Sequence, residues 1–254
     1  MPATAPAPAT ASAPIPSRPQ PWGVLASIGF ALVSFFIRGP ILRYAPLHAL
    51  VQASHRNFLA FSALVLAIQT ASFLVIILAV RLKRWPLAEY LSFAKPRAKD
   101  VALGIAVVLA WYLAQNGYYH FAFGRGFGLA SYRAVLAAGT SPWWYLIQVW
   151  PSLICAPIVE ESTYRGFLWR GVESRMGGTA AFLITSICFT AAHFPYFIEP
   201  RNGTIHFDTL GLYAVTALIL GWLRWRSGGI AVSMVAHAFG NVTIAVAPVL
   251  ITAF

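Results

Sequence analysis

Long apolar runs without Asp, Glu, Lys or Arg constrain this chain more than any other feature of its sequence. Four such runs cover residues 22–37, 58–80, 101–123 and 230–254. Three further runs that are shorter or interrupted by polar groups cover residues 143–172, 179–194 and 210–223. Inside a bilayer every backbone N–H and C=O needs a partner, and these runs lack the alternating polarity of barrel strands. We therefore predict an all-α fold, a polytopic transmembrane helical bundle of about seven spans (six to eight) with interfacial helices.

Three regions follow from these runs. Residues 1–21 are rich in Pro and Ala and are predicted to be a disordered N-terminal tail. Residues 22–142 should hold the N-terminal transmembrane helices and amphipathic loops, and residues 143–254 the helical core with the candidate site. Six basic residues interleaved with Trp85, Tyr90 and Phe93 predict an amphipathic helix over residues 81–100, with its aromatic rings at the lipid headgroups. A second short surface helix is predicted after Pro46.

The formal net charge of +11 fits membrane topology better than nucleic-acid binding. With a cytoplasmic N-terminus and seven spans, twelve of the eighteen Lys and Arg residues fall on or towards the inner side, as the positive-inside rule predicts. We expect a multi-pass integral membrane protein, in the cell membrane if the source is bacterial, with the lipid bilayer around it and no nucleic-acid partner. Cys155 and Cys188 lie in apolar runs and indicate neither a disulfide framework nor a cysteine-ligated metal site.

A pair of adjacent carboxylates interrupts the run at residues 143–172. The chain has only seven acidic residues, and Glu160 and Glu161 stand side by side where an ionised group is costly. Glu161 and Arg165 are four residues apart, so they share one helical face and can form an ion pair. Glu160 points about 100° away and stays free to act. Pro157 should bend the helix here, and Gly166 should allow the close approach of another helix.

Two further polar clusters lie in the last spans. Phe189 and His193 are four residues apart near the end of the run at 179–194, and His237 and Asn241 have the same spacing in the run at 230–254. Buried polar groups need partners, and these clusters have few candidates other than each other. A purely structural hydrogen-bond network between helices would also satisfy them. If they converge, a carboxylate can act as general base towards water while a histidine and an asparagine donate to an oxyanion, which is the chemistry of amide hydrolysis.

The three clusters together resemble the signature motifs of one protein family. Glu160-Glu161-x-x-x-Arg165, Phe189-x-x-x-His193 and His237-x-x-x-Asn241 are similar, in this order, to those of the CAAX prenyl endopeptidase and bacteriocin-processing (CPBP, type II CAAX protease) family of intramembrane proteases. The resemblance covers roughly residues 143–245. The departure is mild, because Tyr164 stands where the family often has phenylalanine before the arginine.

The resemblance implies a role for each of these residues. Glu160 and His193 would activate the water, and His237 and Asn241 would form the oxyanion hole. The supporting residues would be Glu161, Arg165 and Phe189. We expect no metal cofactor. Zinc held by Glu160, His193 and His237 is the alternative, since a carboxylate and two histidines can bind it.

The function expected from the resemblance is an intramembrane endopeptidase that cleaves a membrane-associated protein or peptide substrate near the membrane surface. Two alternatives stay open: a non-enzymatic membrane scaffold or bacteriocin-immunity protein of the same fold, and a proton-coupled transporter. The hypothesis of an enzyme requires a particular geometry. At 1.5 Å per residue, Glu160 and His193 can meet only if one helix runs from about Pro151 to about Val172 with Glu160 near mid-depth.

Overall fold

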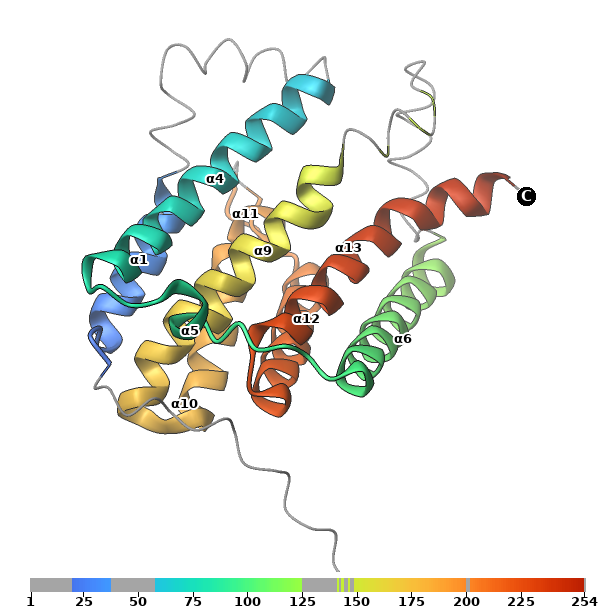
Figure 1. The fold of residues 1–254 in the computed structure, drawn as a ribbon. Coiled ribbons are helices and arrows are strands. Elements are labelled where there is room, and N and C mark those ends of the chain that lie inside the picture. The colour runs from blue at the N-terminus through green and yellow to red at the C-terminus, as the bar shows by residue number, and fades with distance from the viewer. Residues whose placement is uncertain are drawn as a thin grey trace, which may run out of the picture.

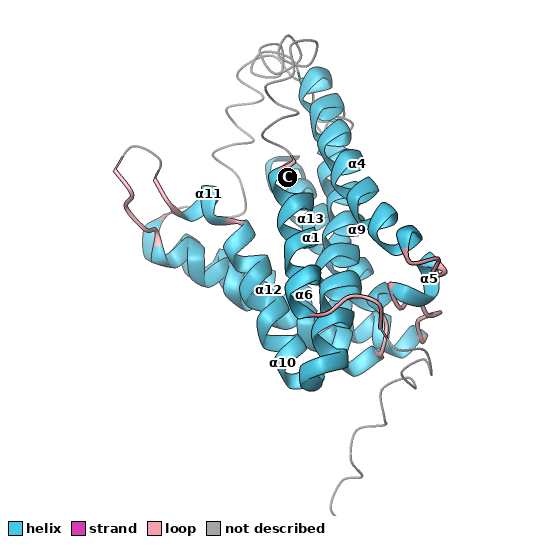
Figure 2. Cartoon of the chain, turned by 90° about the vertical axis from the view of Figure 1, so that its left-hand side faces the viewer, coloured by secondary structure: helices cyan, strands magenta, loops and turns pink. Residues whose placement is uncertain are grey.

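The computed structural model describes residues 20–37, 58–124, 149–199 and 202–253, together with residues 141, 143 and 146. The named elements in these ranges are all helices, and Ile198 and Ile205 form an isolated antiparallel bridge. The long helices gather into one bundle (Figures 1 and 2). The surface helix predicted after Pro46 and all but the last two residues of the predicted disordered tail lie outside the described residues.

Each of the seven apolar runs contains helix, so the predicted all-α membrane bundle is confirmed. The elements are α1 (Val24–Phe36), α4 (Phe58–Leu82), α5 (Leu87–Tyr90), α6 (Ala98–Phe123), the π-helical segment η1 (Pro151–Cys155), α9 (Ala156–Glu161), the π-helical segment η2 (Ser162–Leu168), α10 (Trp169–Ala192), α11 (Phe194–Phe197), α12 (Phe207–Ser227) and α13 (Ile230–Ala253). Within the described residues, five helical stretches are long and apolar enough to cross a membrane, and α1 is a shorter apolar helix. One of the five, Pro151–Ala192, is 42 residues long and includes most of two of the predicted runs, 143–172 and 179–194.

A helical hairpin forms the centre of the bundle. Helix continues without a break from Pro151 through η1, α9, η2 and the first part of α10, which confirms the continuous helix that the sequence required. The chain reverses at Gly177, whose φ of +82° favours glycine because a Cβ would be strained there. Glu160 lies 17 residues before Gly177 and His193 lies 16 residues after it. The two legs are therefore of nearly equal length, and His193 returns to the level of Glu160.

Small residues let the remaining helices pack closely on this hairpin and on each other. A Cβ on Gly171 of α10 would collide with Oγ of Ser27 in α1, so the Ser27 side chain occupies the space beside this glycine. A Cβ on Gly240 of α13 would lie 2.9 Å from Val108 of α6. Such contacts are typical of membrane helices, whose association depends on close van der Waals packing.

The amphipathic helix predicted over residues 81–100 is wrong. Helix α4 ends at Leu82, α5 has only four residues, and α6 begins at Ala98. Two residues of this segment, Arg84 and Ser92, have positive φ angles of 55° and 59°, which a continuous right-handed helix cannot contain.

Three apolar residues of this segment lie inside the protein and not at the headgroups, whereas Phe93 is 40% exposed. Trp85, Tyr90 and Leu91 are at most 5% exposed and pack in one cluster with Phe167 and Ile230. Leu91 also fills the space beside Gly166, where a Cβ would lie 3.1 Å from its Cδ2. The neighbour that Gly166 admits is thus this connecting segment rather than another helix.

Basic residues gather at one end of the bundle. The segment between α4 and α6, the reversal at Gly177 and the turn between α12 and α13 lie at the same end (Figures 1 and 2). The α12–α13 turn is tied to the α4–α6 segment because the N–H of Ile230 donates to the carbonyl of Ser92 at 3.1 Å. The basic residues carried here are Arg81, Lys83, Arg84, Lys95, Arg97, Lys99, Arg175, Arg224 and Arg226. They are a subset of those that the sequence assigned to the inner side of the membrane.

Candidate active site

A cavity of about 460 Å³ lies inside the bundle, and every site residue predicted to be catalytic lines it. The residues that line it are Val65, Ile68, Gln69, Val108, Trp111, Tyr112, Gln115, Ser152, Ala156, Glu160, Tyr164, Phe189, Ala192, His193, Tyr196, Leu212, Tyr213, Thr216, Ile219, Leu220, His237, Gly240, Asn241 and Ile244. Most of these side chains are apolar. The polar groups that converge on one part of the wall come from the hairpin and from α13, two segments far apart in the sequence.

Glu160 faces two imidazole rings. Its Oε2 lies 3.9 Å from Nε2 of His193 and 3.9 Å from Nε2 of His237. Both distances are too long for direct hydrogen bonds, whose N···O separation is about 2.7–3.2 Å. A group of water size that contacts the carboxylate and a ring nitrogen together would fit such spacings. The side chain of Glu160 is 13% exposed, so the carboxylate opens onto the cavity.

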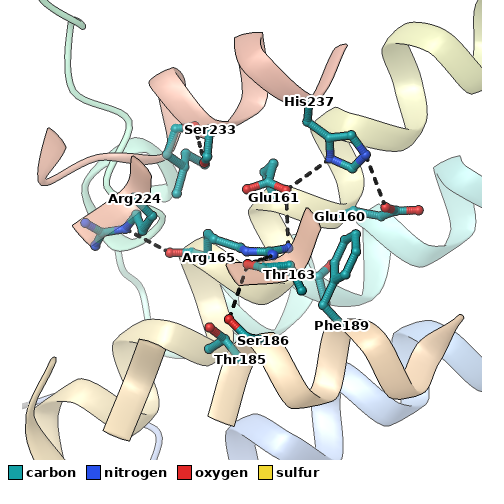
Figure 3. A network of polar contacts seen from close by, with 12 residues as sticks. Glu160, Glu161, Thr163, Arg165, Thr185, Ser186, Phe189, Arg224, Ser233 and His237 are labelled. Carbon is teal, nitrogen blue, oxygen red and sulfur yellow. Dashed lines mark hydrogen bonds and ion pairs between the residues drawn. The ribbon is translucent and has the colours of Figure 1, made fainter. Parts of the chain in front are cut away.

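Glu161 points the other way, into a buried polar network (Figure 3). Its Oε1 lies 3.3 Å from Nη1 of Arg165 and 3.1 Å from Nδ1 of His237. The side chains of Glu161 and Arg165 are both 0% exposed. The expected i,i+4 ion pair is therefore present, and the adjacent carboxylates face opposite sides of the His237 ring because the helix turns them apart by about 100°.

Arg165 binds more than its ion-pair partner. Its Nη2 donates to the carbonyl of Ala217 in α12 at 3.0 Å, and its guanidinium carbon lies 4.2 Å above the Phe189 ring. The guanidinium thus joins the first leg of the hairpin to α12 and to the second leg. Phe189 is 1% exposed and fills the space between Arg165 and the histidines.

Hydrogen bonds fix the tautomers of both histidines. Nδ1 of His193 lies 2.7 Å from the carbonyl oxygen of Phe189, an acceptor only, so this nitrogen carries the proton. Nδ1 of His237 faces the Glu161 carboxylate, which is likewise an acceptor, and carries its proton for the same reason. The Nε2 atoms, which face Glu160, then carry the lone pairs of the neutral rings and can accept a proton.

Asn241 lies one helical turn beyond His237 on α13. Its Nδ2 donates to the carbonyl of Ser152 at 3.2 Å, and the residue lines the cavity. Because an amide nitrogen carries two hydrogens, one remains for a second acceptor. The contact ties α13 to the first turn of the hairpin, where η1 replaces the α-helical pattern.

Two residues that sequence reasoning did not single out complete the surroundings of the site. Arg224 is 4% exposed and donates from Nε to the carbonyl of Arg165 at 3.0 Å. In the sequence, Arg224 directly follows the apolar run at 210–223. We interpreted this basic residue only as a determinant of membrane topology. Tyr213 stacks on His193 with a centroid distance of 4.5 Å, and nothing in its local sequence indicates this contact.

A metal site is not apparent among the described residues. No group of three His, Cys, Asp or Glu side chains in these ranges has an arrangement that could hold a metal ion. The proposed zinc ligands are Glu160, His193 and His237, with the 3.9 Å separations given above. We therefore derive no step of the chemistry through a metal.

Comparison with known proteins agrees with the motifs. No curated protein and no solved structure gives a significant match to the chain. Residues 142–243 match the family model described as type II CAAX prenyl endopeptidase Rce1-like, and this range contains all three motifs. The resemblance found in the sequence is thus confirmed, because residues 142–243 of the chain are similar to the Rce1-like type II CAAX prenyl endopeptidase family.

Proposed function

We propose that the protein is an intramembrane endopeptidase in which Glu160 and His193 activate a water molecule against a peptide bond. The observation that carries this proposal is the spacing around Glu160, whose Oε2 lies 3.9 Å from the Nε2 atoms of His193 and His237 at the wall of a cavity. The match of residues 142–243 to a protease family model supports a membrane protease in general terms.

Attack begins with a water molecule between Glu160 and the scissile carbonyl carbon. The carboxylate of Glu160 takes one proton from the water as the oxygen bonds to the carbon. General base catalysis of this kind contributes roughly 10²–10⁴-fold to the rate. The neighbouring Glu161 cannot replace it, since Arg165 and His237 already occupy its Oε1.

The oxyanion formed by this attack needs donors. Asn241 offers the second hydrogen of its amide, because the first is bound to Ser152. His237 can donate from Nε2 only in its imidazolium form, since Glu161 holds the proton of the neutral ring on Nδ1. We propose that the imidazolium form is the one that binds the oxyanion, with the Glu161 carboxylate balancing its charge.

The proton then passes to the leaving amine. Nε2 of His193 carries the lone pair of the neutral ring because its Nδ1–H is bound to the Phe189 carbonyl. It can accept the proton that Glu160 took from water and deliver it to the amine nitrogen as the C–N bond breaks. The products are a new carboxylate and a new amine, and the enzyme returns to its starting protonation state.

The proposal also covers the metal content, the substrate and the membrane orientation of the protein. No resident metal takes part, and zinc bound by Glu160, His193 and His237 is the alternative to be tested. The substrate is a membrane-associated protein or peptide that enters the cavity from the bilayer or its surface. The N-terminus lies in the cytoplasm, on the side where the basic residues gather.

A comparison of peptides released from cells tests the function and finds the substrate. Cells would carry the wild type, Glu160→Gln or Glu89→Gln at matched expression. Glu89→Gln is the matched control, because the same chemical change is made on an exposed residue that does not line the cavity.

The expected result is a set of fragments present with the wild type and with Glu89→Gln and absent with Glu160→Gln. Identical peptides in all three strains, with the host phenotype intact, would favour the non-enzymatic scaffold. Proton-coupled flux through vesicles that contain the purified protein would instead identify a transporter.

A further inference from the structure

Tyr213 on α12 covers the imidazole ring of His193, one of the two residues proposed to activate water. The ring centroids of Tyr213 and His193 are 4.5 Å apart, with an angle of 24° between their planes. Phe189 lies at the same centroid distance from His193, with an angle of 36°. Two aromatic rings at this distance restrict the imidazole far more than one would. Tyr196 lies beside both rings, 5.7 Å from Tyr213 and 6.0 Å from His193.

His193 needs such support because of its place in the chain. It follows Ala192, the last residue of α10, and its own φ and ψ of −95° and 12° are not helical. The hydrogen bond from Nδ1 to Phe189 fixes the tautomer, and the contacts with Phe189 and Tyr213 restrict the orientation of the ring plane. Contacts on the ring faces are what hold Nε2 towards Glu160.

The position of Tyr213 is itself fixed by the buried network. Ala217, one helical turn after Tyr213, accepts hydrogen bonds from Nη2 of Arg165 at 3.0 Å and from Oγ of Ser186 at 3.2 Å. One turn further, a Cβ on Gly221 would lie 3.0 Å from both Phe182 and Ser186, so α12 lies tightly against α10. These contacts set the register of α12 that brings Tyr213 onto His193.

We infer that Tyr213 is a positioning residue, whose ring holds the imidazole of His193 with Nε2 directed at Glu160. The inference rests on the proposed function. The contact with His193 is made by the ring face of Tyr213 and not by its hydroxyl. Phenylalanine at this position should therefore preserve the function, and an aliphatic residue should not. Misplacing a catalytic group by about 1 Å can cost on the order of 10²-fold in rate.

The kinetic test compares Tyr213→Phe, Tyr213→Leu and a control, Tyr118→Leu, in the purified full-length protein. Tyr118 is a 58% exposed tyrosine of α6 that does not line the cavity. With a peptide substrate, Tyr213→Leu should lower kcat at least about tenfold with little change in KM. Tyr213→Phe and the control should keep kcat near the wild-type value. In a His193→Gln background, Tyr213→Leu should cause no further loss.

A second readout does not depend on activity. In protein labelled with ¹⁵N-histidine, the ring signals of His193 are assigned from their loss in His193→Gln. The wild type and Tyr213→Phe should show one tautomer with the proton on Nδ1, whereas Tyr213→Leu should show a mixture or a broadened signal.

The outcomes separate this inference from the proposed function. An unchanged His193 signal in Tyr213→Leu overturns the positioning role, whether or not the protein is active. Loss of kcat in Tyr213→Phe also overturns it, because the hydroxyl would then be the functional group. Absence of peptide hydrolysis by the wild type, together with the expected change in the His193 signal, contradicts the proposed function alone.

Discussion

Nδ1 of His237 lies 3.1 Å from Oε1 of Glu161, so a carboxylate on the hairpin orients an imidazole on α13. The same oxygen binds Arg165, which keeps Glu161 away from the cavity. Glu161 therefore stabilises the contacts between helices, while the adjacent Glu160 faces the cavity where a substrate would lie. This division of roles follows from the helical geometry and leads to the first prediction.

Replacing Glu161 by glutamine should reduce turnover although the residue does not face the cavity. The amide keeps the shape of the side chain but carries no charge, so it can no longer balance the imidazolium form of His237 that we propose binds the oxyanion. We expect kcat for peptide cleavage to fall at least about tenfold, as happens when the orienting carboxylate of a catalytic histidine is removed. Glu89→Gln serves as the control, and equal kcat values for the two variants would contradict the role given to Glu161.

A second prediction concerns the contact between α1 and the hairpin. Gly171→Ala introduces a Cβ that would lie 1.9 Å from Oγ and 2.6 Å from Cβ of Ser27. Overpacking of this kind costs about 1–3 kcal/mol, so the Tm in detergent should fall. Adding Ser27→Gly to the same chain should restore it. Gly29→Ala on α1, where no atom lies within 4 Å of the added Cβ, is the matched control. Equal Tm values for Gly171→Ala and Gly29→Ala would show that the helices do not meet here.

The third prediction concerns topology. Basic residues gather at the end of the bundle that holds the α4–α6 segment, and the positive-inside rule assigns this end to the cytoplasm. The two native cysteines, Cys155 and Cys188, can be replaced, and single cysteines introduced as Lys95→Cys or Asn202→Cys, both at exposed positions.

In right-side-out vesicles, a membrane-impermeant maleimide should label Asn202→Cys directly and Lys95→Cys only after permeabilisation. The reverse pattern would place the N-terminus outside. Labelling of both positions in sealed vesicles would mean that the protein inserts in both orientations.

The fourth prediction concerns metal. We expect the purified protein to contain zinc well below one atom per chain and to keep its activity in the presence of a zinc chelator. His193→Gln, which removes a candidate ligand, should leave the metal content unchanged. Loss of activity with the chelator and its recovery with added zinc would establish the zinc alternative.

The elements that local sequence patterns encode were predictable. Hydrophobic runs long enough to span a bilayer located the helices, and the need to bring Glu160 to His193 predicted the unbroken helix that begins at Pro151. The Glu161–Arg165 ion pair was predictable too, because residues four apart on one helix are neighbours whatever the rest of the fold does.

The features that depend on distant contacts were not predictable. Trp85 and Tyr90 stand among basic residues, which suggested an interfacial helix, but they are buried against Phe167 and Ile230 from other parts of the chain. Tyr213 is one of ten tyrosines and belongs to no motif. Its contact with His193 depends on the register between α12 and α10, which no short stretch of sequence specifies.

The role of Glu160 as general base is the central claim, and a rate measurement tests it most directly. The cleavage rate of a peptide substrate would be compared for purified wild type, Glu160→Gln and Glu89→Gln in lipid vesicles, with equal Tm values as proof of folding. The account predicts a rate roughly 10²–10⁴-fold lower for Glu160→Gln and unchanged for Glu89→Gln. Cleavage by Glu160→Gln at the wild-type rate would contradict it.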